Sequence, residues 1–60
     1  MAAFLSVPDA AAHLGVHPAL IYKEIRAGRL LAVKIGAKVI RIPMTSFESY
    51  IQTQLSSGGN

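Results

Sequence analysis

The spacing of apolar residues predicts a short helix near the N-terminus. Ser6 followed by Asp9 has the form of a capping box, and Pro8 suits a first helical turn. Apolar residues then recur at helical spacing on one face, at Val7, Ala10, Ala11 and Leu14. Gly15 stands where a helix would end, because glycine enters the left-handed conformation at no steric cost.

A second helical pattern begins within a few residues of the first. His17 is placed to cap it and Pro18 fits its first turn, with Val16 plugging the turn between the helices. Ile21 and Ile25 define its buried face, with Pro18 and Glu24 at the edges. The opposite side carries Ala19, Lys23, Arg26 and Ala27, while Tyr22 stands at the boundary and Gly28 closes the helix. This spacing is typical of a helix-turn-helix.

After the second helix the apolar residues no longer recur at helical spacing but at every second position. Leu30 and Leu31 are expected to return to the core. Alternation over 32–35 and again over 39–42, around a turn at 36–38, predicts a β-hairpin that Pro43 stops. Val33 and Ile35 fall on one side of the first strand, and Ile40 and Ile42 on one side of the second; Lys34 and Arg41 are placed together on the outer face.

A third helix is predicted after the hairpin. Thr45 with Glu48 has the form of a second capping box. The residues expected on its packing face are Phe47, Tyr50, Ile51 and Gln54.

The two ends of the chain are expected to differ. Residues 1–5 are apolar and are expected to form a strand or arm anchored by Phe4 and Leu5. Residues 56–60 have the composition of a flexible tail, so the predicted domain is 1–55. The expected fold is mainly α with a small β-hairpin.

Charge is the compositional feature that bears most on function. All six Lys and Arg lie between positions 23 and 41 with one acid, so this segment carries +5 while the flanks carry −2. A polyanion is therefore the first partner to consider. The chain has no cysteine and no apolar run long enough for a membrane span, which favours a cytoplasmic location without membrane association. Sixty residues leave little room for a catalytic cleft, so we expect a binding module rather than an enzyme, with no cofactor.

Several motifs together resemble a known family. They are Ala10 to Ala12 before Leu14-Gly15-Val16, Ile21-Tyr22 and Ile25 before Gly28 and Leu30, Val33, Ile35 and Gly36 in the hairpin, and Ile42-Pro43 before an aromatic-containing helix. Over positions 5 to 51 the chain resembles the small DNA-binding domains of phage excisionases and of the MerR-related superfamily. The resemblance implies a winged helix-turn-helix: helix, turn, helix, two-stranded wing and C-terminal helix.

In that family the second helix enters the major groove of double-stranded DNA and the wing lies beside the backbone or in the minor groove. Carried over by position, and joined by the other basic residues of the central segment, the expected DNA contacts are His17, Pro18, Ala19, Tyr22, Lys23, Arg26, Arg29, Lys34, Lys38 and Arg41. The resemblance implies an excisionase, a recombination directionality factor that partners an integrase and further copies of itself on adjacent sites.

Other interpretations of the same residues stay open. A small prophage-type transcriptional regulator, AlpA-like or MerR-like, would use the same domain, although a MerR-type regulator also needs a dimerisation helix and an effector-binding domain. A basic protein-interaction module with an acidic partner is a third possibility. Asp9 and His13 are better explained as a surface pair or cap than as half of a metal site. Leu20 and Leu55 are expected to be exposed candidates for protein contact.

Overall fold

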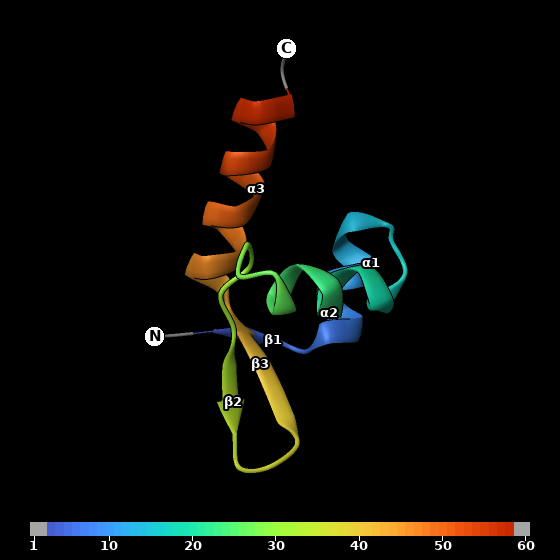
Figure 1. The fold of residues 1–60 in the computed structure, drawn as a ribbon, viewed down its shortest axis with the longest axis vertical. Coiled ribbons are helices and arrows are strands. Elements are labelled where there is room, and N and C mark those ends of the chain that lie inside the picture. Colours follow the sequence, from blue (N-terminus) through green and yellow to red (C-terminus); the bar gives the residue numbers. More distant parts are fainter. Residues whose placement is uncertain (1–2, 59–60) are drawn as a thin grey trace.

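Three helices and a three-stranded antiparallel sheet make up the fold in the computed structural model, which describes residues 3–58. In chain order the elements are β1 (Phe4–Leu5), α1 (Val7–Leu14), α2 (Pro18–Arg26), β2 (Val33–Ile35), β3 (Val39–Pro43) and α3 (Met44–Gly58). The strand order β1-β3-β2 makes β3 the central strand. The β2–β3 hairpin and α3 extend in opposite directions, with α1 and α2 to one side (Figure 1). The winged helix-turn-helix is confirmed, with β1 as a third strand beside the predicted two.

Both ends of α1 are closed as the sequence predicts. The Ser6 hydroxyl accepts a hydrogen bond from the backbone N–H of Asp9 at 3.1 Å, which satisfies one amide of the first turn. Gly15 adopts φ +67°, and the N–H of Val16 reaches the carbonyl of Ala11 at 3.0 Å. This left-handed residue turns the chain sharply enough to start α2 three residues later.

The core lies where α1, α2, β3 and α3 meet. Its buried apolar side chains are Val7, Ala10, Ala11, Ile21, Leu30, Ile42 and Phe47. The alanines of α1 allow α2 to approach closely. Leu14 was expected on the buried face but is exposed, because it lies at the last residue of α1, at the edge of an open groove shared with α3.

The strand register decides which residues of the sheet face the core. Leu5 lies opposite Ile42, and both belong to the face that packs on the helices. Phe4 lies opposite Pro43 on the other face and is 49% exposed, so its expected anchoring role was wrong. Successive residues of a strand alternate between faces, and Leu5 already holds the core side.

The residues that follow α2 also divide between core and solvent. Leu30 is buried, but Leu31 is 73% exposed, so the prediction that both return to the core was wrong for Leu31. The backbone carbonyl of Leu31 accepts a hydrogen bond from the Ser46 hydroxyl, which ties this turn to α3. Adjacent residues in an extended segment point in opposite directions, so only one of the two leucines can enter the core.

The third helix begins directly after the sheet. Its first residue is Met44, whose N–H donates to the carbonyl of Ala3 at 2.9 Å, so Thr45 lies inside the helix and the predicted cap was misplaced. Phe47 is buried and Tyr50 and Ile51 are half-buried, as predicted, whereas Gln54 is exposed. Residues 56–58, expected in a flexible tail, continue α3, and 59–60 lie outside the described residues.

Candidate nucleic-acid interface

The N-terminus of α2 is closed by an imidazole. Nδ1 of His17 accepts a hydrogen bond from the backbone N–H of Ala19 at 3.0 Å, and Pro18 occupies the first turn. The cap predicted at His17 is therefore confirmed. Nδ1 can accept only when the proton of the neutral ring is on Nε2. Pro18 has no N–H and the N–H of Leu20 donates to the carbonyl of His17 at 3.0 Å, so what favours an anion such as a phosphate at this end of α2 is the positive end of the helix dipole.

The outer face of α2 carries the predicted contact residues on one stripe. Ala19, Lys23 and Arg26 follow one another at intervals of four and three residues, and all three are exposed. The Tyr22 ring lies beside them and is also exposed. The stripe thus begins with a small residue and continues with two cations, whose charges attract a polyanion.

The wing divides its basic residues between two faces. Lys34 pairs with Ile40 and Arg41 with Val33, so Lys34 shares the face of Ile40 and Arg41 lies on the opposite face. The expectation that Lys34 and Arg41 share the outer face was therefore wrong. Residues paired directly across two antiparallel strands share a face, and the register pairs each of these basic residues with an apolar residue of the other strand. Nη1 of Arg41 donates to the carbonyl of Ile40 at 2.9 Å.

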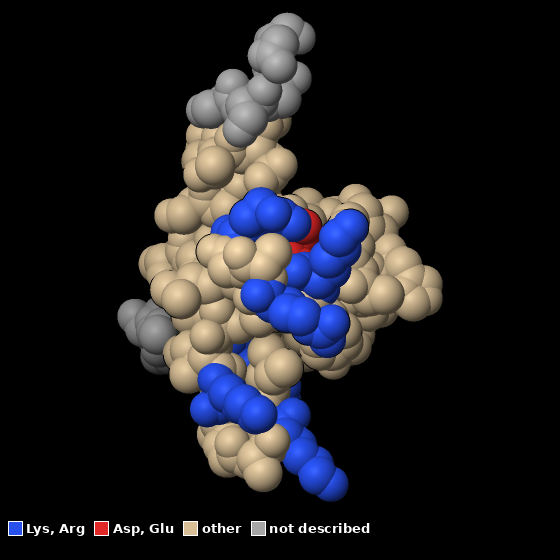
Figure 2. All heavy atoms as spheres, viewed as in Figure 1, with Lys and Arg blue, Asp and Glu red and all other residues tan. Residues whose placement is uncertain are grey.

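Basic side chains are prominent on the face of the molecule drawn in Figure 2. Figure 2 shows Lys and Arg atoms over α2, the turn that follows it and the β2–β3 hairpin, with very little acidic surface among them. We call this surface the basic face. Lys38 is exposed in the turn between β2 and β3. The basic face therefore extends from α2 to the end of the wing, as a DNA-binding surface with a helix and a wing requires.

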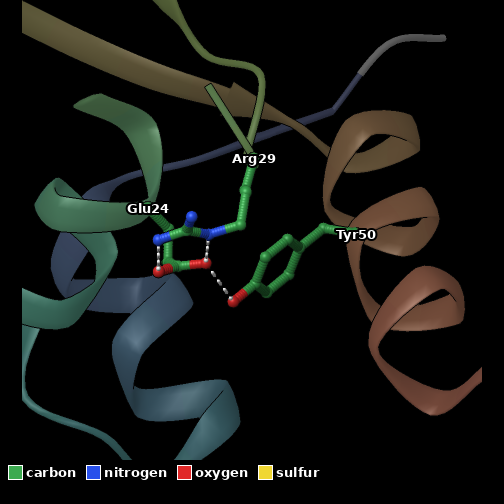
Figure 3. Close-up of polar contacts among 3 residues, drawn as sticks. All are labelled: Glu24, Arg29 and Tyr50. Atoms are coloured by element: carbon green, nitrogen blue, oxygen red, sulfur yellow. Dashed lines mark hydrogen bonds and ion pairs between the residues drawn. The ribbon is translucent and has the colours of Figure 1, made fainter. Parts of the chain in front are cut away.

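Arg29 has a partner that the charge pattern did not reveal. Its Nε and Nη2 donate to the two carboxylate oxygens of Glu24 at 2.8 and 2.9 Å, and the Tyr50 hydroxyl donates to Glu24 Oε1 at 3.1 Å (Figure 3). Glu24, expected at the edge of the buried face, is buried, while Ile25 is only half-buried. We call these three residues the Glu24 network; it links α2, the turn after it and α3.

The Glu24 network changes the titration of its members. The hydrogen bonds from Arg29 hold the pKa of the Glu24 carboxyl below its ordinary value of 4.5, although burial acts in the other direction. The bond and charge of Glu24 raise the pKa of Arg29. Burial, followed by the bond to Glu24, raises the pKa of the Tyr50 phenol. Sequence analysis missed the network; its one signal was that Glu24 is the only acid in the basic segment.

The remaining candidates lie away from the basic face. The His13 ring packs near the Phe47 ring, with centroids 6.0 Å apart, and residues 3–58 hold no group of three or more potential metal ligands of the His, Cys, Asp or Glu type. Leu20 and Leu55 are exposed, as predicted, and line the open groove between the helix pair and α3. None of the described helices has the length and hydropathy to cross a membrane.

Comparison with known proteins identifies the domain that this geometry represents. The family model described as a helix-turn-helix domain matches residues 4–55, which spans β1 to α3. No curated protein and no solved structure matches the chain. The family is a DNA-binding domain found in excisionase-like proteins. With its capped second helix on a basic face and a hairpin beside it, the chain belongs to the helix-turn-helix domain family and is a DNA-binding protein.

Proposed function

We propose that the chain is an excisionase of a phage or mobile element, which binds several sites in an attachment region and directs an integrase toward excision. The observation that carries this proposal is the exposed stripe of Ala19, Lys23 and Arg26 on α2, continued by the basic wing. In this role the protein performs no chemistry itself. It organises the DNA on which the integrase acts.

The small size of the DNA-facing stripe bears on how such a protein finds its sites. Of the residues on α2, Arg26 and Lys23 are the ones able to reach base edges with charged groups, and each good contact of that kind discriminates by about 1–3 kcal/mol. Phosphate contacts supply affinity without sequence information. We therefore expect modest specificity for one site, raised by cooperative binding of neighbouring copies on adjacent sites.

DNA binding is tested first by its salt dependence. If the basic face engages about four phosphates, the slope of log K against log salt is about −3.6, a loss of roughly 100-fold between 50 and 200 mM salt. A flat plot would show that phosphates do not drive binding, and would favour a protein-interaction module with an acidic partner.

The excisionase role needs two further measurements. Footprinting on an attachment region is expected to show tandem protected sites, whereas a single protected site over a promoter would favour a small transcriptional regulator. Recombination with the cognate integrase in vitro is expected to shift from integration to excision when the protein is added. Unchanged direction at saturating protein would refute the role.

A further inference from the structure

One edge of the Arg29 guanidinium binds Glu24, and the rest of the group faces solvent. Its side chain is 52% exposed, whereas that of Glu24, its partner, is 10% exposed. A guanidinium carries five N–H donors, and two of them are directed at Glu24. Among the described residues the other three have no partner, and Figure 3 shows the third nitrogen pointing away from the carboxylate. The ion pair therefore buries the acid and presents the cation to solvent.

The Glu24 carboxylate occupies a position that is unfavourable for an acid by itself. Glu24 lies in the last turn of α2, where the helix dipole disfavours negative charge, and it is buried. Its two hydrogen bonds from Arg29 and the one from Tyr50 offset both costs. The backbone reinforces the arrangement, because the carbonyl of Glu24 accepts from the N–H of Arg29 at 3.0 Å and of Leu30 at 3.2 Å. Both the main chain and the side chain of Arg29 are thus fixed to one residue.

The position of Arg29 in the fold suggests what the fixed guanidinium does. Arg29 lies in the turn between α2 and β2, and Figure 2 shows basic atoms over this turn as well as over the helix and the hairpin. Contact with Arg29 requires that a duplex contacting both elements also reaches this turn. An arginine fork already held in position loses less conformational freedom on binding a phosphate than a free side chain does.

We propose that Glu24 is a positioning residue for DNA binding, which holds the Arg29 guanidinium so that its open edge contacts a backbone phosphate between α2 and the wing. Tyr50 supports the same arrangement from α3. The inference rests on the proposed contact of duplex DNA with the basic face. It differs from the simpler role in which Glu24 only neutralises Arg29 and fills space.

The two roles predict opposite changes for Glu24→Gln, which raises the net charge of the protein by one. Neutralisation alone predicts tighter binding to DNA, because a negative charge next to the duplex is removed. Positioning predicts weaker binding, by roughly 5- to 10-fold, and a salt slope smaller in magnitude by about 0.9, because one phosphate contact is lost. Glu48→Gln on α3 makes the same chemical change at an exposed acid and serves as the matched control.

The experiment measures the affinity of each full-length variant for one labelled duplex at several salt concentrations, at a temperature where circular dichroism shows all of them folded. Glu24→Gln is expected to bind more weakly than both the wild type and Glu48→Gln. Arg29→Ala is expected to lose a similar factor, and adding Glu24→Gln to it is expected to cause no further loss. A Glu24→Gln variant that binds as tightly as wild type, or tighter, overturns the proposal.

Two charge-conserving variants keep the test decisive if Glu24→Gln does not fold. Arg29→Lys retains the charge without the planar fork and is expected to bind about as weakly as Arg29→Ala. Tyr50→Phe leaves the ion pair but removes one hydrogen bond to the carboxylate, and a smaller loss is expected. Unchanged affinity in Arg29→Lys overturns the proposal, whereas a wild type that does not bind the duplex refutes the proposed DNA contact itself.

Discussion

Replacing Ile42 with alanine tests whether the register of the sheet assigns the two faces of the wing correctly. Ile42 is completely buried, on the face it shares with Leu5 and Ile40. The substitution removes three carbons, worth about 0.8 kcal/mol each in transfer free energy, and leaves a cavity, so the expected loss is about 2–5 kcal/mol. The whole free energy of unfolding of a 60-residue domain is about 3–9 kcal/mol.

Ile35 provides a control of identical chemistry. It lies on β2, on the face opposite to Ile42, and is 53% exposed. The same three carbons removed there give up about half the transfer free energy and leave no cavity, so the expected loss is about 1 kcal/mol. Valine substitutions at both positions give a milder pair, with about 0.5–1.5 kcal/mol expected at Ile42 and less than this at Ile35.

Urea denaturation followed by circular dichroism measures both losses. With a slope of about 1 kcal/mol per molar urea, Ile42→Ala is expected to lower the midpoint by about 2 M or more, or to unfold the protein without denaturant. Ile35→Ala is expected to lower it by about 1 M or less. Equal losses at the two positions, for alanine and for valine, would refute the assignment of faces.

Three further predictions concern the interface and its supports. Arg26→Ala is expected to weaken binding to a specific site by about 1–3 kcal/mol and to random duplex by less, measured by titration on both DNAs; equal losses would assign Arg26 to phosphate alone. His17→Ala removes the side-chain cap of α2 and is expected to lower the free energy of unfolding by about 0.5–2 kcal/mol, while His17→Asn is expected to restore most of it in the same urea titration. Because the folded pKa of Glu24 is depressed, its contribution to stability is complete above pH about 4.5 and is lost as the pH falls below that value. The difference between the urea midpoints measured in acid and at neutral pH is therefore expected to be smaller in Glu24→Gln than in wild type. An unchanged difference would contradict the depressed pKa.

Local signals located the three helices, both ends of α1 and the start of α2 correctly. Ser6, Gly15 and His17 each act within four residues along the chain, so their chemistry could be recognised from the sequence. The exposed stripe of α2 followed from helical spacing in the same way. The cap expected at Thr45 failed because the first amide of α3 is satisfied by the carbonyl of Ala3, more than forty residues away in the chain.

The sheet shows why alternation alone was insufficient. Period two separates the residues of one strand into two sets, but only the pairing between strands decides which set faces the core and which residues of the neighbouring strand share its side. That is why Lys34 and Arg41 were placed on one face and lie on two, and why Phe4 was taken for an anchor. No local property of Leu30 and Leu31 distinguishes the buried leucine from the exposed one.

By itself the sequence determined that this is a small basic helix-turn-helix domain with a hairpin, because helical period, caps and turn glycines are local and the charges are concentrated in one segment. The tertiary structure alone decided that Arg29 is held by Glu24 and Tyr50. Those three side chains come from different elements, and the free energy of a buried carboxylate depends on which donors the fold brings within hydrogen-bonding distance.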